Sequence, residues 1–133
     1  MAVVDLREAV IRVVVPPRPD VLHLLRSVAA SVGARMSMPL DDVEELRIAV
    51  DEAATLLLER GADRPEGPLE MELTCTDERL RARLRLGAAM PAEDVRSSWP
   101  WRVISGVVED ASIEPTDSET TITFSKTAPG TGR

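Results

Sequence analysis

The sequence predicts a two-layer α/β sandwich, an α+β arrangement in which about three helices cover one face of a mostly antiparallel, mixed sheet. Two observations lead to this fold class. Apolar residues recur at helical spacing in segments 21–32, 41–60 and 101–111, whereas segments 9–15, 69–75, 80–86 and 120–126 have strand patterns. The resulting order is strand, helix, helix, strand, strand, helix, strand, which favours helices collected on one face of a sheet. A length of 133 residues indicates one domain.

The first strand and the first helix are separated by prolines. Segment 9–15, AVIRVVV, is rich in β-branched residues, and the prolines that follow it cannot continue a hydrogen-bonded ladder. Asp20 is expected to cap the helix over 21–32, and Gly33 is expected to end it. The inner stripe of this helix is predicted to be Val21, Leu24, Leu25, Val28 and Val32.

The second helix, over 41–60, has the clearest pattern in the chain. Its apolar stripe has spacings of 3, 4, 3 and 4 and consists of Val43, Leu46, Val50, Ala53 and Leu57. Asp41 followed by Glu44 is close to a capping box, and Gly61 stands where a left-handed C-cap is expected. The segment therefore predicts an amphipathic helix that faces the core.

Segments 69–75 and 80–86 alternate apolar and polar residues and predict an antiparallel hairpin. Arg81, Arg83 and Arg85 fall on one face of its second strand. Two alternatives follow for these arginines: they bind an anion, or they form the solvated face of a sheet that is buried on one side. The only cysteine, Cys75, is expected to be a small buried side chain.

The last third of the chain predicts a helix over 101–111 and a final strand over 120–126. Pro100 suits the first turn of that helix. Trp99 and Trp101 flank Pro100 in a chain with few aromatic residues, so their rings either close the core at the start of the helix or contact a protein partner. The domain is expected to span 1–126, with 127–133 as a flexible tail.

Composition limits the function. The net charge of −7 disfavours direct nucleic-acid binding, because a protein that binds phosphates needs a basic face. One cysteine and one histidine leave no set of zinc ligands, and no metal site is expected. No apolar run is long enough to cross a membrane, and no secretory signal is recognisable, so a cytoplasmic protein is expected.

The stretch EELRIAVDEAAT, 44–55, resembles the first conserved helix of the anti-sigma regulatory kinases, the RsbW and SpoIIAB type of the GHKL ATPases. This resemblance implies the histidine-kinase-like ATPase fold, also called the Bergerat fold. In that family a glutamate of this helix acts as general base and an asparagine four residues later holds Mg²⁺ and ATP phosphate. The matching positions here are Glu52 and Leu56.

The chain departs from the family at each of three ATP motifs. Leu56 cannot coordinate a hard cation. Leu86 and Ala88 stand where the resemblance places an adenine-binding aspartate and a glycine, and the segment 97–101, SSWPW, replaces a glycine-rich phosphate loop. We therefore expect no cofactor, with Glu52 a vestige of the general base in a pseudo-kinase. The alternative is Mg-ATP bound by an active enzyme.

The degenerate pattern is similar to the actinobacterial anti-sigma factors of the RsbW/UsfX type. It implies a protein that sequesters a stress or developmental sigma factor and is antagonised by an anti-anti-sigma partner with a STAS domain. Arg26, Trp99 and Trp101 are the candidate partner contacts, and a homodimer through the sheet is compatible with the family. The alternatives are an active serine/threonine kinase that phosphorylates the STAS partner through Glu52, and a small structural or ligand-sensing module.

Overall fold

The computed structural model describes Leu6 and residues 8–61 and 65–128. Its strands form one sheet in the order β1-β2-β3-β5-β4, and every neighbouring pair is antiparallel. The strands are β1 (Val10–Val15), β2 (Glu66–Cys75), β3 (Arg79–Gly87), β4 (Glu109–Pro115) and β5 (Thr120–Thr127). The two-layer fold class is confirmed, although no pair within the described residues is parallel, as a mixed sheet would require.

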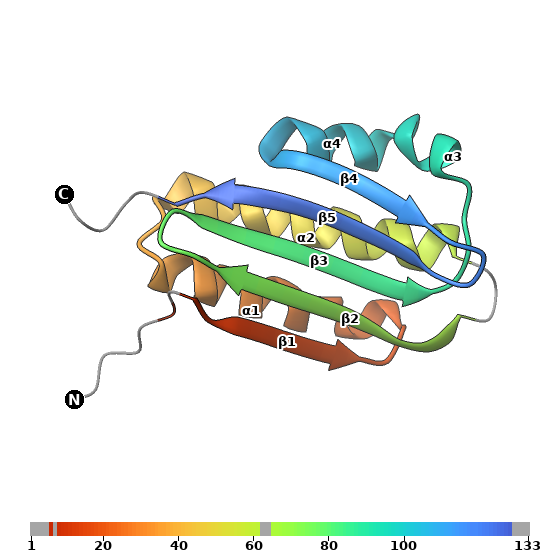
Figure 1. Cartoon of the computed structure of the whole chain (residues 1–133), viewed down its shortest axis with the longest axis horizontal. Helices are drawn as coiled ribbons and strands as arrows, with labels where there is room; N and C mark the ends of the chain where they lie inside the picture. The colour runs from red at the N-terminus through yellow and green to blue at the C-terminus, as the bar shows by residue number, and fades with distance from the viewer. Residues whose placement is uncertain (1–5, 7, 62–64, 129–133) are drawn as a thin grey trace.

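The helices lie behind one face of the sheet, and the other face is open (Figure 1). They are a 3₁₀ turn, η1 (Pro19–Val21), followed by α1 (Leu22–Arg35), α2 (Leu40–Arg60), α3 (Ala92–Arg96) and α4 (Trp99–Val107). The central helix is α2, which packs against α1 on one side and α4 on the other. It buries the whole stripe predicted for it, from Val43 to Leu57. No helix in the described part of the chain is long and apolar enough to cross a membrane.

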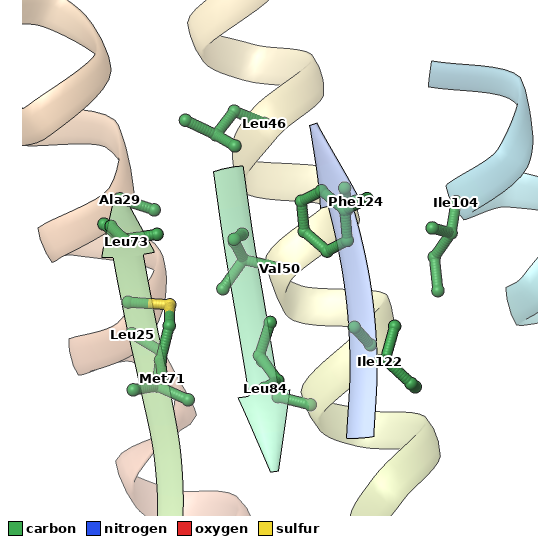
Figure 2. Packing of buried hydrophobic residues seen from close by; sticks show 14 of the residues in the cluster. Leu25, Ala29, Leu46, Val50, Met71, Leu73, Leu84, Ile104, Ile122 and Phe124 are labelled. Atoms are coloured by element: carbon green, nitrogen blue, oxygen red, sulfur yellow. The ribbon is translucent and has the colours of Figure 1, made fainter. Parts of the chain in front are cut away.

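The core lies between the two layers and is almost entirely aliphatic (Figure 2). Leu25 of α1, Met71 of β2 and Phe124 of β5 are fully buried. Ile104 reaches the same core from α4. Cys75 is buried as expected, and burial raises the pKa of its thiol.

The open face of the sheet carries the polar residues of the alternating strands. Arg81, Arg83 and Arg85 of β3 share that face, as predicted. Arg85 forms ion pairs with Glu70 of β2 and, at 3.0 Å, with Glu119. These pairs fit the alternative in which the arginines form a solvated face.

The predicted helix over 101–111 is wrong beyond Val107. The chain becomes extended at Val108 and continues as β4, which pairs with β5 and buries Ile113 against the helices. This strand supplies the edge of the sheet that β5 would otherwise leave unpaired. The short helix α3 was not predicted either, because five residues are too few to show a helical period.

Four predicted helix ends are also wrong. Pro39, not Asp41, precedes the first residue of α2, and no side chain caps that end. Gly61 follows α2 in an extended conformation, with φ −65° and ψ 161°, rather than a left-handed one. Asp20 lies within η1 and does not cap α1, and Gly33 lies inside α1, which continues to Arg35.

The last strand, β5, extends one residue beyond the predicted end at 126. Thr127 belongs to β5, where it pairs with Arg79, so it is not part of a tail. The rest of the predicted tail, apart from Ala128, lies outside the described residues.

Candidate functional site

The helix that resembles the family motif directs one side toward α4. Glu45, Ala49, Glu52 and Leu56 follow one another at intervals of 4, 3 and 4 residues and therefore share a face of α2. Lys126 identifies the direction of that face, because its Nζ lies 2.8 Å from a carboxylate oxygen of Glu45 and donates to the carbonyl of Val107 at 2.8 Å. Val107 is the last residue of α4. Glu52 and Leu56 thus lie on the α4 side of α2.

Glu52 is half-buried on this face. Burial raises the pKa of its carboxyl above the ordinary value, and the negative charges of Asp51 and Glu59 raise it further. A raised pKa is compatible with a proton acceptor near neutral pH, but it also follows for any carboxyl group that is partly removed from water beside other acids. The pKa direction therefore does not by itself assign a catalytic role to Glu52.

Leu56 is 1% exposed and belongs to the core. The two positions matched to the adenine-binding motif are buried with it, Leu86 at 1% and Ala88 at 4%. Residues that line a cleft open to water keep accessible surface, so these three side chains do not line such a cleft. In addition, an aliphatic side chain offers no oxygen to Mg²⁺.

Gly61 allows the C-terminal end of α2 to pack directly against Leu86 in β3 and against Ala88, which follows β3. A Cβ atom at residue 61 would lie 3.1 Å from Cβ of Ala88, 3.2 Å from Cδ2 of Leu86 and 2.8 Å from the carbonyl oxygen of Leu57. On the other side, the hydroxyl of Thr120 donates a buried hydrogen bond of 2.7 Å to the carbonyl of Ala88. The segment matched to the adenine motif is therefore packed against Gly61 on one side and hydrogen-bonded to Thr120 on the other.

The segment that replaces the glycine-rich loop forms the turn between α3 and α4 and the first residues of α4, and the N–H groups of Ser97, Ser98 and Trp101 already have partners. The N–H groups of Ser97 and Ser98 donate to the carbonyls of Glu93 and Val95. The hydroxyl of Ser98 accepts from the N–H of Trp101 at 3.4 Å and donates to the carbonyl of Val95. A phosphate-binding loop needs free N–H groups directed at the ligand, and these amides are engaged within the chain.

The residues at the three motif positions therefore do not fit a nucleotide and its metal ion. Leu56, Leu86 and Ala88 are aliphatic, and the loop segment consists of two serines, two tryptophans and a proline. Met90, Val95, Trp101 and Ile104, which lie before, within or after that segment in sequence, are buried core residues, and the most accessible of them, Trp101, is 9% exposed. Glu52 is the one predicted site residue that keeps the chemistry of the motif.

The candidate partner residue Arg26 lies on the outer side of the helix layer, between α1 and α2. Its Nε is 3.6 Å from Oδ1 of Asp51, too far for a hydrogen bond, and this buried nitrogen has no hydrogen-bond partner in the described chain. A shallow pocket of about 160 Å³ opens beside it, lined by Arg26, Glu44, Arg47, Ile48 and Asp51. We call these five residues the Arg26 surface.

The Arg26 surface combines an apolar centre with charged surroundings. Ile48 is 42% exposed, and the Arg47 guanidinium beside it is held at 3.0 Å by Glu44. An apolar side chain with a polar rim is the usual composition of a protein interface. The sequence carried one overlooked signal for this surface: Ile48 is an apolar residue off the core-facing stripe of α2.

The two tryptophans at the start of α4 have different surroundings. Trp99 is 72% exposed, whereas Trp101 is 9% exposed. The prediction that Trp101 contacts a partner does not fit its burial; its ring closes the core at the start of the helix, as the other alternative stated. Trp99 remains available to a partner. Because α2 separates α1 from α4, Trp99 and Arg26 belong to different parts of the helix layer.

Comparison with known proteins identifies the family. The histidine kinase-like ATPase domain matches residues 15–126, from the end of β1 to the penultimate residue of β5. Comparison with curated proteins gave no significant match. The family match covers most of the chain, and the sheet backed by helices described above is consistent with it. The chain therefore belongs to the histidine kinase-like ATPase domain family.

Proposed function

We propose that the chain is an anti-sigma factor: it sequesters an alternative sigma factor of RNA polymerase, and a STAS-domain anti-anti-sigma factor releases it. Membership of the histidine kinase-like ATPase family supports this function, because the resemblance of the α2 motif is to the anti-sigma members of that family. The Arg26 surface is the proposed contact with the sigma factor, with Trp99 as a second contact.

The observation that carries the proposal is the incomplete pairing of the Arg26 guanidinium beside the exposed Ile48. The Nε of Arg26 is buried and lies 3.6 Å from its ion-pair partner Asp51 without a hydrogen bond, whereas the side chain as a whole is 39% exposed. A carboxylate from a partner, placed between Arg26 and Ile48, would pair with this guanidinium through charge-assisted hydrogen bonds. Ile48 would be covered in the same contact, which adds a hydrophobic contribution of about 25 cal/mol per Å² of apolar surface buried.

The proposed mechanism is steric occlusion without nucleotide, so the chain is a pseudo-kinase. Its support is the burial of Leu56, Leu86 and Ala88 and the engaged amides between Ser97 and Arg102. The family resemblance further favours a homodimer formed through the open face of the sheet, which analytical ultracentrifugation would detect.

The second candidate function is an active serine/threonine kinase that phosphorylates the STAS partner with Mg-ATP. The observation that favours it is Glu52, which keeps the residue type of the family's general base at the matching position and is half-buried on the α4 side of α2. Incubation of the chain with a STAS-domain protein and radiolabelled ATP separates the two candidates. The pseudo-kinase predicts no transfer of label, and transfer that is abolished by Glu52→Gln would establish the kinase.

The test of the anti-sigma function is a capture experiment with purified components. The wild-type chain is immobilised and exposed to the alternative sigma factors and the STAS-domain proteins of its own genome. Arg26→Ala is expected to weaken capture of the sigma factor by about tenfold or more, as expected for a contact of charged groups at an interface centre. Arg60→Ala, which removes an exposed arginine at the end of α2, outside the Arg26 surface and outside α4, is the matched control and should bind as wild type does.

If the wild-type chain retains neither a sigma factor nor a STAS protein, the proposal is wrong. Equal weakening by Arg26→Ala and Arg60→Ala would leave an anti-sigma factor but displace its contact from the Arg26 surface.

A further inference from the structure

The two edges of the sheet differ in how they are protected. Exposed edge strands invite pairing with other chains, and proteins usually block them with charges, prolines or bulges. The β4 edge has such features: its register with β5 shifts between Glu109 and Ser112, and it ends at Pro115. The β1 edge, VIRVVV, has one charge, and its register with β2 is regular throughout.

The backbone groups that β1 directs away from β2 can be identified. The N–H of Cys75 donates to the carbonyl of Ala9 at 2.9 Å, so Ala9 and Cys75 form a hydrogen-bonded pair. Hydrogen-bonded and non-hydrogen-bonded pairs alternate along an antiparallel ladder. Val10, Arg12 and Val14 therefore direct their N–H and C=O groups to the side of β1 on which residues 6, 8–61 and 65–128 place no further strand. We call this side the free edge; it is the lower border of the sheet in Figure 1.

An apolar groove lies on the helix layer beside the entry to this strand. It has a volume of about 370 Å³ and is lined by Leu6, Ser27, Val28, Ser31, Val32 and Arg35. Leu6 leads into β1, and the other residues belong to the side of α1 away from α2. Ile11 and Val13, on the inner side of β1, are only half-buried. An added strand would thus find backbone partners along the edge and apolar surface for its inward side chains.

Strand β2, which already pairs with β1, indicates which kinds of side chain an added strand should carry. In β2, Leu69, Met71 and Leu73 point into the core, whereas Glu70 and Glu72 point to the open face. Glu72 forms an ion pair of 3.0 Å with Arg12. Along the free edge, Ile11 and Val13 point inward and Arg12 points outward, just as they do toward β2. An added strand that alternates apolar and acidic residues, as β2 does, would therefore match this edge.

We propose that β1 is a docking edge that takes an extended segment of a partner protein, apolar and acidic at alternate positions, as a sixth strand antiparallel to β1. The acidic residue lies opposite Arg12, and the apolar residues cover Ile11, Val13 and the groove. This site is distinct from the Arg26 surface, and it does not depend on the proposed anti-sigma function.

The experiment uses the full chain, labelled with ¹⁵N, and a synthetic capped peptide Leu-Glu-Met-Glu-Leu-Thr, which has the sequence of residues 69–74. In the free chain the amides of Val10, Arg12 and Val14 should exchange rapidly with solvent, whereas those of Ile11 and Val13 should be protected. Addition of the peptide should protect the first three amides and shift their resonances. The matched peptide Leu-Lys-Met-Lys-Leu-Thr should bind several-fold more weakly, because one of its lysines would lie opposite Arg12.

Two variants separate backbone pairing from side-chain contact. Val14→Pro removes an outward N–H without removing a hydrogen bond to β2, and should weaken peptide binding about tenfold. Val14→Ala shortens the same exposed side chain but keeps the N–H, and should bind as wild type does. Equal loss in both variants would overturn strand addition. Protection of the Val10, Arg12 and Val14 amides in the free chain, by self-association or by any other segment, would also overturn it, as would a peptide that leaves them unprotected.

Discussion

Replacement of Leu56 by the family residue, Leu56→Asn, examines whether the nucleotide region has become part of the core. Leu56 is 1% exposed, and full burial of a leucine side chain contributes about 1.5–3 kcal/mol. The new amide would be buried among aliphatic groups without partners, which costs about 1–3 kcal/mol more. The expected loss is therefore about 2.5–6 kcal/mol, a large part of the roughly 5–15 kcal/mol that stabilises a typical domain.

The assay is equilibrium unfolding in urea, followed by circular dichroism. With a slope of about 2 kcal/mol per molar urea, this loss lowers the unfolding midpoint by about 1.2–3 M. Ile48→Asn is the matched control, because it makes a comparable change on the exposed side of the same helix and should lower the free energy of unfolding by less than about 1 kcal/mol. Leu56→Met preserves side-chain volume and should cost less than about 1.5 kcal/mol. If Leu56→Asn is as mild as Ile48→Asn, Leu56 borders an open site and the reasoning is refuted.

Three further predictions follow from the same region. Gly61→Ala places a methyl group against Ala88 and should lower the free energy of unfolding by about 1–3 kcal/mol, whereas Gly106→Ala, a helical position with open space around it, should leave it unchanged or raise it. Lys126→Met leaves the carboxylate of Glu45 and the carbonyl of Val107 without their donor and should lower the free energy of unfolding by about 1–3 kcal/mol. The loss should be smaller in high salt, because salt screens the ion pair with Glu45. The folded-state pKa of Glu52 is raised, so the folded state binds its proton more tightly than the unfolded state, and ionisation destabilises the fold as pH rises from about 4.5 through that pKa. Glu52→Gln should therefore be more stable than wild type at pH 7, and the difference should shrink on acidification to pH 4; a pH-independent difference in denaturation midpoint would contradict this.

The fold was predictable where one element repeats its pattern over several turns. The stripe from Val43 to Leu57 predicted α2 because its face buries against the sheet through its whole length. By contrast, β4 reads EDASIEP and has only Ile113 buried. Its position is determined by the free edge of β5, which is a tertiary feature without a local sequence signal.

The ends of the helices were less predictable than their interiors. Asp41 and Gly61 have the residue types of caps, but the chain uses neither in that way. Asp41 lies in the first turn, where a carboxylate is favourable near the positive end of the helix dipole whether or not it caps. Gly61 serves a different purpose, since its missing side chain permits contact with Ala88. Residue type signalled both positions, but the tertiary structure decided their role.

The candidate site, too, was predictable from the sequence only in part. Matching the motif by sequence placed Glu52 and Leu56 on one face of α2, and the structure brings both to the α4 side. The Arg26 surface depends on the pairing of α1 with α2, which puts Asp51 beside Arg26 from 25 residues away in sequence. The opposite surroundings of Trp99 and Trp101 could not be assigned from sequence, because the helix begins at Trp99 and its rotation depends on packing against α2.

The central claim is that an ATPase-like fold has here become a nucleotide-free scaffold for protein binding. Isothermal titration of Mg-ATP into the wild-type chain examines this claim most directly. The account predicts no saturable heat, with any dissociation constant weaker than about 1 mM, or less than about 4 kcal/mol of binding free energy. Saturable binding of one Mg-ATP per chain in the micromolar range would contradict it.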